Sequence, residues 1–198
     1  TSLSQTQGFM PSNALLAHSE AKLFIADLAE GAQIERIQVQ IDQRIKREME
    51  RLSALYQAAF EGFQKSSKSG ISNVVVLSYG DLLAPDALWY FAQLAPVLQK
   101  DDSLWAVNGW NDQGIAPYAA DPTVILRTDW FSGSGWMVTA QGMKEIASLW
   151  RLGRPWEALF RDSRLRMGRQ FLMPEMSRVI PDSGWTFGET LQKAGLRL

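Results

Sequence analysis

The side chains that could do chemistry in this chain are carboxylates, hydroxyls and arginines. Cysteine is absent, and His18 is the only histidine among 198 residues. These counts exclude disulfides, thiolate chemistry, cysteine-bound zinc and any metal site built from several histidines. A serine triad would have to use His18, which we interpret as an ordinary surface or core residue.

Arginine is concentrated between residues 151 and 169. Guanidinium groups bind phosphates and carboxylates well, but Glu157 and Asp162 lie among these arginines. We therefore interpret the stretch as a solvated or internally paired helix face rather than a phosphate site. Its members are Arg151, Arg154, Arg161, Arg164, Arg166 and Arg169.

Composition indicates one globular domain of ordinary size, with 46% hydrophobic and 21% charged residues. A formal net charge of -1 gives no general attraction to nucleic acid, so we expect no nucleic-acid partner. No apolar run approaches the roughly 20 residues that span a bilayer. We expect a chain that is soluble or peripheral to a membrane complex.

The first 63 residues are predicted to form a helical arm. One helix, capped by Ser12 or Asn13, is expected to end at Glu30. A second is expected over Gln33–Phe63, because its apolar residues recur in steps of three and four. Its early turns extend beyond the reach of the core, so we predict that they bind a partner protein. The partner-binding residues would be Ile34, Ile37, Ile41 and Ile45.

Residues 64–198 are predicted to form an α/β domain. Apolar runs bounded by turn residues predict strands, and longer periodic segments predict helices. Asp86 is expected to cap a helix that Pro96 bends or ends. The expected strands are Asn73–Leu77, Ser103–Val107, Thr123–Arg127 and Arg169–Met173, and the expected helices are Ala87–Leu94, Ala140–Trp150 and Trp156–Arg166. Their alternation predicts a mostly parallel sheet flanked by helices.

Polar residues in the same region predict a buried network that shapes a loop, because a domain this apolar tolerates such groups only when they are paired. They are Asn111, Asp112, Arg127 and Asp129.

Six short motifs in a little over half of the chain match one known family in order and nearly in spacing. They are Ala84-Pro85-Asp86, Asp102-Ser103-Leu104-Trp105, Trp110-Asn111-Asp112-Gln113-Gly114, Arg127-Thr128-Asp129-Trp130-Phe131, Gly133-Ser134-Gly135-Trp136 and Pro174-Glu175-Met176-Ser177-Arg178. On these motifs the chain resembles glycosyltransferase family 13, the inverting beta-1,2-N-acetylglucosaminyltransferases that act on alpha-mannosyl glycoproteins and O-mannose. The resemblance implies a GT-A fold.

The resemblance also implies a manganese site that binds the diphosphate of UDP-N-acetylglucosamine. The family's acidic triplet falls on Ser78, Tyr79 and Gly80, none of which replaces the carboxylate that binds the metal. Asp81 is one residue late, and in an extended chain a shift of one residue turns the side chain to the other face. We therefore predict that the metal site is lost and that no cofactor is bound.

Other site positions are altered as well. The family's catalytic base, an Asp after a Trp, falls on Glu157, which we interpret as a helix-terminal Glu favoured by the dipole rather than as a base. Ser134 replaces the family's Leu that touches the donor sugar. Trp110 or Trp130 would flank the acceptor cleft and could stack on a sugar ring. The candidate cleft residues are Trp110, Asp112, Trp130 and Trp136.

Two further departures concern binding and compartment. We find no strand-helix-strand unit before Asn73, and in this family such a unit holds the uridine. The family's paired cysteines fall on Ala106 and Phe171, and their joint loss favours a non-oxidising organellar or cytoplasmic compartment over the Golgi lumen.

These departures lead us to expect a catalytically inactive, degenerate GT-A-like domain that serves as an interaction or scaffold subunit of a larger hetero-complex. One alternative is a carbohydrate or nucleotide-sugar binding module. Another is an active N-acetylglucosaminyltransferase that uses manganese and UDP-N-acetylglucosamine, if the chain is part of a longer protein.

Overall fold

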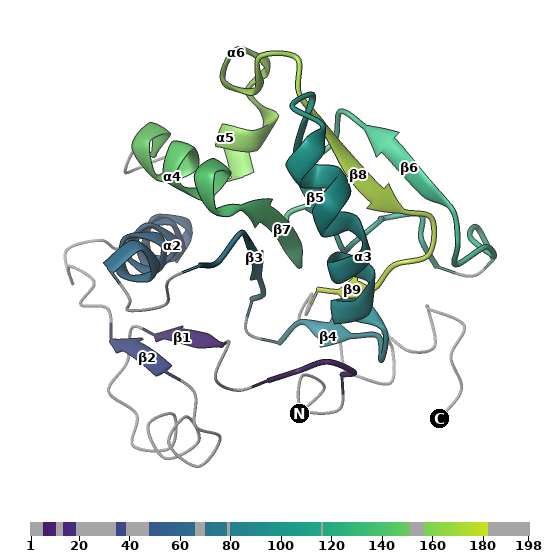
Figure 1. Cartoon of the computed structure of the whole chain (residues 1–198), viewed down its shortest axis with the longest axis horizontal. Helices are drawn as coiled ribbons and strands as arrows, with labels where there is room; N and C mark the ends of the chain where they lie inside the picture. The colour runs from purple at the N-terminus through teal and green to yellow at the C-terminus, as the bar shows by residue number, and fades with distance from the viewer. Residues whose placement is uncertain are drawn as a thin grey trace.

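A computed structural model gives the architecture of the chain (Figure 1). It describes residues 6–10, 14–18, 35–38, 48–65, 70–78, 80–115, 117–150 and 157–181. A mixed sheet lies at the centre, with helices on both of its faces, and the predicted α/β fold is confirmed.

The central sheet has five strands in the order β3-β7-β5-β8-β6. Neighbours β5 and β8 are parallel, and the other three neighbouring pairs are antiparallel. Four of these strands overlap the predicted ones, and β7 follows the Gly133–Gly135 turn. The bounds are Asn73–Val76 for β3, Leu104–Asn108 for β5, Ile125–Thr128 for β6, Trp136–Thr139 for β7 and Gln170–Pro174 for β8.

Both faces of β5 are buried, which explains why this strand is an almost continuous apolar run. Alternate residues of β7 and β8 enter two separate cores. A shift of register between Leu104 and Ala106 breaks the alternation, so that Trp105 and Ala106 share one core. The first core holds Trp105, Trp136 and Phe171, and the second holds Val107, Met137 and Leu172.

Helix α3, Ala87–Lys100, covers the second core and buries Tyr90, Phe91 and Leu98. The predicted end of this helix near Leu94 is wrong, because the helix continues through Pro96. Proline removes one backbone hydrogen bond of the helix. Burial of Leu98 against the sheet stabilises the turn that follows and offsets this loss.

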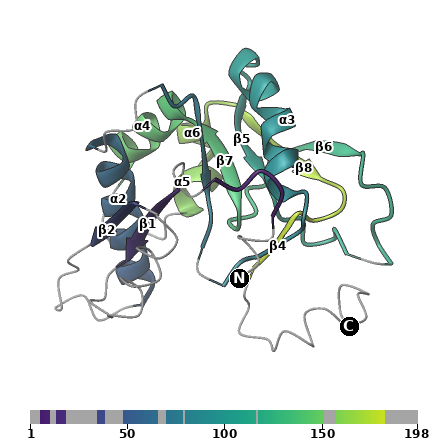
Figure 2. The same ribbon diagram turned by 60° about the horizontal axis from the view of Figure 1, so that its bottom comes forward.

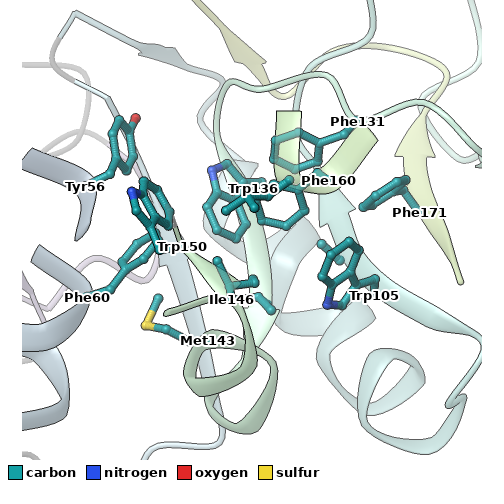
Figure 3. Close-up of a cluster of buried hydrophobic side chains, with 13 residues drawn as sticks. Tyr56, Phe60, Trp105, Phe131, Trp136, Met143, Ile146, Trp150, Phe160 and Phe171 are labelled. Carbon is teal, nitrogen blue, oxygen red and sulfur yellow. The ribbon is translucent and has the colours of Figure 1, made fainter. Parts of the chain in front are cut away.

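Three helices cover the first core: α2, Glu48–Lys65; α4, Ala140–Leu149; and α5, Glu157–Arg161. Figure 3 shows aromatic side chains of α2 and α5 meeting those of the sheet, together with Met143 and Ile146 of α4. The rings of Phe131 and Phe160 stack with centroids 4.0 Å apart, and the Phe60 ring lies 5.4 Å from that of Trp150. Phe60 belongs to α2, so the predicted domain division after residue 63 falls within a helix that packs into this core.

The predicted helix over Trp156–Arg166 is instead two short helices in the described part, α5 and α6, Ser163–Arg166. Asp162 separates them, because its side chain accepts a hydrogen bond from the backbone N–H of Arg164 and caps α6.

The front of the chain differs from the prediction. Residues Leu15–His18 form strand β1 and Glu35–Gln38 form strand β2, and the two strands are parallel. The expected helices are therefore wrong at these residues. Residues 37 and 41 fit the period of a strand as well as that of a helix, and polar Gln38 and Gln40 alternate with Ile37, Val39 and Ile41.

Two consequences follow from this parallel pair. Parallel neighbours require a crossover connection, and the residues between these two strands, 19–34, lie outside the described part of the chain. We expected no strand-helix-strand unit before Asn73. The two parallel strands β1 and β2 lie there, so this expectation is wrong as far as strands are concerned. Ile37 lies on β2, whereas Ile34, Ile41 and Ile45 lie outside the described residues. Because Ile37 lies on a strand, it is not part of the predicted apolar face of a helix. The binding of a partner protein stays a prediction.

A third, two-stranded sheet joins β4, Leu82–Leu83, to β9, Val179–Ile180. In Figure 2 these strands lie beside the end of the central sheet. Within the part of the chain that the structure describes, no helix is both long and apolar enough to cross a bilayer.

Candidate functional site

A pocket of about 240 Å³ brings together five segments that are distant in sequence. Helix α2 contributes Leu52 and Tyr56, and the chain after β3 contributes Ser78 and Asp81. The turn before β7 and helix α5 supply the opposite wall. The remaining lining residues are Ser132, Gly133, Ser134, Glu157, Arg161 and Pro181.

Asp81 reaches this pocket through a tight turn after β3. Its backbone N–H donates to the Ser78 carbonyl over 3.2 Å, and its Oδ2 accepts from the Ser78 N–H over 2.8 Å. Gly80 has a φ of 90°, so the chain between them is not extended. The sequence argument that a shift of one residue would turn Asp81 away is therefore wrong. Whether the metal site is lost stays a prediction.

Tyr56 connects α2 to this turn. Its hydroxyl lies 2.5 Å from Ser78 Oγ, within hydrogen-bond distance. Burial raises the pKa of Tyr56 to about 12, and the charges of Asp81 and Glu157 add to the effect. The phenol therefore stays neutral at physiological pH and can donate a hydrogen bond.

The turn before β7 lies against Glu157. A Cβ atom on Gly133 would lie 3.6 Å from Glu157 Cγ, and Gly133 has a φ of 92°. Buried Asn108 supports the turn from behind: its Nδ2 donates to the Trp130 carbonyl over 3.0 Å, and its Oδ1 accepts from the Ser132 N–H over 3.4 Å. These contacts fix the wall that carries Ser132 and Ser134.

Helix α5 supplies one acidic and one basic group. Glu157 Oε2 is buried and accepts no hydrogen bond from any described residue. The Arg161 guanidinium donates to the Phe131 carbonyl over 3.3 Å and lies 4.4 Å from the centre of the Trp130 ring. A buried acceptor that lacks a hydrogen bond costs folding free energy, so Oε2 of Glu157 is suited to accept a hydrogen bond from another group.

The structure brings together four of the predicted site residues: Ser78, Asp81, Ser134 and Glu157. Gly80 forms the turn between two of them, and Tyr79 lies outside the described residues.

The predicted cleft residues do not line this pocket. Trp136 is 1% exposed and lies in the first core, as Figure 3 shows. Trp110 donates to Asp112 Oδ1 over 2.6 Å, away from the pocket lining. Trp130 is 49% exposed and reaches the pocket only through Arg161, which lies over its ring.

Sequence reasoning did not assign Tyr56, Ser132 or Arg161 to the site. Tyr56 was part of a helical stripe, and Arg161 was one of several arginines in a row. No local signal separated them from residues of similar type, because their roles depend on elements that meet only in the fold.

The other described arginines of this row are internally paired, as the sequence suggested. Arg164 pairs with Asp162, Arg166 with Asp129, and Arg169 with Glu145.

The predicted polar network is buried only at Asn111. Its Nδ2 donates to the carbonyls of Pro174 and Glu175 over 3.0 and 2.9 Å. Asp112, Arg127 and Asp129 make their contacts at exposed positions.

The described residues contain no group of three or more His, Cys, Asp and Glu side chains that could hold a metal by themselves. The pocket offers oxygen donors, however, chief among them the Asp81 carboxylate. Manganese and magnesium prefer oxygen, and magnesium is commonly held by one or two carboxylates together with substrate phosphates. This donor set therefore fits a divalent cation that is shared with a diphosphate.

The fold and site define an α/β protein with a pocket that contains two carboxylates. The model of the GNT-I family matches residues 13–195, which include β1, β2 and every pocket residue. The chain belongs to the GNT-I family, and the resemblance seen in its motifs is confirmed.

The chain is also similar to an alpha-1,3-mannosyl-glycoprotein 2-beta-N-acetylglucosaminyltransferase from Arabidopsis thaliana. The two are 32% identical over 122 residues, which are 62% of this chain and 26% of the relative. The match thus spans about a quarter of that relative's length.

Proposed function

We propose that this chain is the catalytic core of a glycosyltransferase that moves a sugar from a nucleotide-sugar donor to a sugar hydroxyl. The observation that supports this function is the convergence of Asp81 and Glu157 in one pocket. The name of the Arabidopsis relative suggests the substrate class, namely N-acetylglucosamine as the transferred sugar and a mannosyl group as the acceptor.

Glu157 would act as the general base. Its carboxylate accepts the proton of the acceptor hydroxyl while that oxygen bonds to the anomeric carbon of the donor sugar. The bond from this carbon to the nucleotide diphosphate breaks, and the diphosphate leaves with the electron pair. An unpartnered Oε2 suits this role, because no protein donor competes for it among the described residues.

Asp81 would hold the divalent cation, which when bound neutralises charge on the leaving diphosphate. Its Oδ2 accepts from the Ser78 N–H over 2.8 Å, and this contact orients the carboxylate that lines the pocket. Arg161 adds a positive guanidinium to the same pocket, where it can bind a phosphate oxygen.

The test is transfer from UDP-N-acetylglucosamine to methyl α-mannoside with manganese, followed by mass spectrometry. We expect Glu157→Gln to lower kcat by roughly 100-fold or more, as for the loss of a general base. Asp81→Asn should raise the manganese concentration that is needed. Glu61→Gln is the control, because Glu61 is exposed on α2 and does not line the pocket. Activity that survives Glu157→Gln would refute the assignment of the base.

A second candidate is the inactive scaffold or sugar-binding subunit. It is favoured by Ser78 and Gly80, which occupy two of the three positions where the resemblance implies acidic residues. In this case the folded protein would show no transfer and no manganese-dependent binding of UDP-N-acetylglucosamine by calorimetry. Transfer that depends on Glu157 would exclude it.

A further inference from the structure

Three residues from two elements form a chain of contacts that ends at the pocket carboxylate. The Tyr56 hydroxyl lies 2.5 Å from Ser78 Oγ, and the Ser78 N–H donates to Asp81 Oδ2 over 2.8 Å. Ser78 therefore contacts Tyr56 through its side chain and Asp81 through its backbone. Ser78 thus links the Tyr56 hydroxyl to the Asp81 carboxylate.

The turn that carries Asp81 contains a conformationally flexible residue. Gly80 lies at its centre with a φ of 90°, a conformation that restricts the chain only weakly because glycine populates both signs of φ. Within the turn, the Asp81 N–H donates to the Ser78 carbonyl over 3.2 Å, and the Ser78 N–H donates to Asp81 Oδ2 over 2.8 Å. Both hydrogen bonds involve Ser78, so a contact that holds Ser78 helps to fix the geometry of the turn.

Tyr56, by contrast, is held rigidly. Its ring makes an edge contact with Phe60 at 6.0 Å, and Phe60 in turn contacts Trp136 at 6.1 Å and Trp150 at 5.4 Å. Figure 3 shows these rings side by side, with the Tyr56 hydroxyl at the edge of the cluster. The hydroxyl is therefore anchored to the first core of the domain.

The protonation state of Tyr56 suits this role. Because burial holds its pKa near 12, the phenol keeps its proton over the whole physiological range. It can donate to Ser78 Oγ, and it places no negative charge next to Asp81 and Glu157.

We propose that Tyr56 is a positioning residue: by holding Ser78, it sets the direction of the Asp81 carboxylate and thereby the affinity of the pocket for a divalent cation. This inference rests on the proposed function, which assigns Asp81 to the cation. It goes further by making cation affinity depend on a helix that contributes no charged group to the pocket lining.

The test measures manganese binding in the presence of saturating UDP, using the electron paramagnetic resonance signal of free manganese. Tyr56→Phe removes only the hydroxyl and keeps the ring in the core. We expect it to weaken manganese binding about 5- to 10-fold, the range of one hydrogen bond. Ser78→Ala should have a similar effect, and the double variant should bind little worse than either single variant, because both changes break the same contact.

Kinetics give a second measurement. Tyr56→Phe should raise the manganese concentration for half-maximal transfer and leave kcat nearly unchanged at saturating manganese, whereas Glu157→Gln should lower kcat. Tyr118→Phe is the matched control, since Tyr118 is exposed and does not line the pocket. A general loss of structure in Tyr56→Phe would appear as a large drop in Tm and an equal loss of UDP binding without metal.

Suppose that Asp81→Asn weakens manganese binding as proposed. Unchanged manganese affinity in Tyr56→Phe, or additive effects of Tyr56→Phe and Ser78→Ala, would then overturn the inference about Tyr56. If Asp81→Asn leaves manganese affinity unchanged, the proposed role of Asp81 fails, and the inference fails with it. If the unaltered protein does not bind manganese, both the proposed role of Asp81 and the inference about Tyr56 fail.

Discussion

Gly135 and Val179 pack so closely that a side chain does not fit between them. A Cβ atom on residue 135 would lie 2.5 Å from Val179 Cγ1. Gly135 also has a φ of 49°, in the left-handed region that residues with a Cβ adopt at a cost. The contact joins the start of β7 to β9, the strand that follows Arg178.

Gly135→Ala should therefore combine two penalties. The left-handed backbone costs about 1 kcal/mol for a residue with a Cβ, and overpacking against Val179 adds about 1–3 kcal/mol. We expect the free energy of unfolding in urea to fall by more than about 2 kcal/mol.

Gly168→Ala is the matched control, because Gly168 has a φ of 78° and a Cβ there would meet no atom within 4 Å. It should show only the backbone penalty. Adding Val179→Ala to Gly135→Ala should couple favourably, because the smaller side chain makes room for the new Cβ. Equal losses in the two glycine variants would show that packing against Val179 is unimportant.

Gly80→Ala should affect the site more than the fold. Its φ of 90° is strained for alanine, so the Ser78–Asp81 turn should open and the Asp81 carboxylate should shift. We expect weaker manganese binding with UDP and a loss of about 1 kcal/mol in the free energy of unfolding. Gly70→Ala, at a φ of 79° in open space, should lose comparable stability and keep its manganese affinity. Equal manganese affinities in the two variants would contradict the importance of this turn.

Arg178 joins three segments of the chain: the start of α3, the loop before β6 and the turn before β9. It is 7% exposed, and its guanidinium donates to Asp86 Oδ2 over 2.9 Å and to the carbonyls of Met176 and Pro122 over 2.6 and 2.7 Å. Arg178→Lys should lower the free energy of unfolding by about 2 kcal/mol, because an ammonium group cannot reach all three acceptors.

Asp86→Asn provides the comparison for Arg178→Lys. The Asp86 side chain is half-exposed, so we expect a loss below about 1 kcal/mol in the same urea measurement. If the two variants lose equal stability, the ion pair rather than the set of carbonyl contacts would explain the role of Arg178.

The elements that the sequence predicted correctly are those with unambiguous local signals. The apolar run at Leu104–Asn108 forms a strand that is buried on both faces, and the run at Asn73–Val76 forms a strand that is partly buried. At β2, by contrast, Ile37 and Ile41 satisfy both periods, so the sequence could not separate strand from helix. Asp86 occupies the predicted N-cap position of α3, but its side chain makes no cap hydrogen bond and pairs with Arg178 instead.

The sequence predicted which positions belong to the site, but it did not predict how their side chains are arranged in space. Glu157 and Ser134 followed from motif spacing, and the structure places both in the pocket. The direction of Asp81 depends on the positive φ of Gly80, and the recruitment of Tyr56 depends on how α2 packs. These features arise from tertiary contacts, which spacing along one chain does not encode.

Two buried tyrosines should make the protein sensitive to alkaline pH. Burial raises the pKa of Tyr56 to about 12 and raises that of Tyr90 still further. The Tyr90 hydroxyl donates to the Asn108 carbonyl over 2.8 Å, a contact that ionisation would remove. Both phenols are therefore held in the neutral form by the folded state.

The stability that these neutral phenols provide should be complete below pH about 10, where unfolded tyrosine also keeps its proton. As pH rises from about 10 to 12, the unfolded state loses protons that the folded state retains, so each tyrosine lowers the free energy of unfolding by up to about 1.4 kcal/mol per pH unit. Tyr90→Phe should flatten this decline, and Tyr56→Phe should flatten it up to pH about 12. Urea unfolding at several pH values, with tyrosinate absorbance followed in parallel, measures both effects. Tyr118→Phe, at an exposed position, is the control and should follow the unaltered protein. A decline with the same slope in all variants would show that neither buried phenol governs alkaline unfolding.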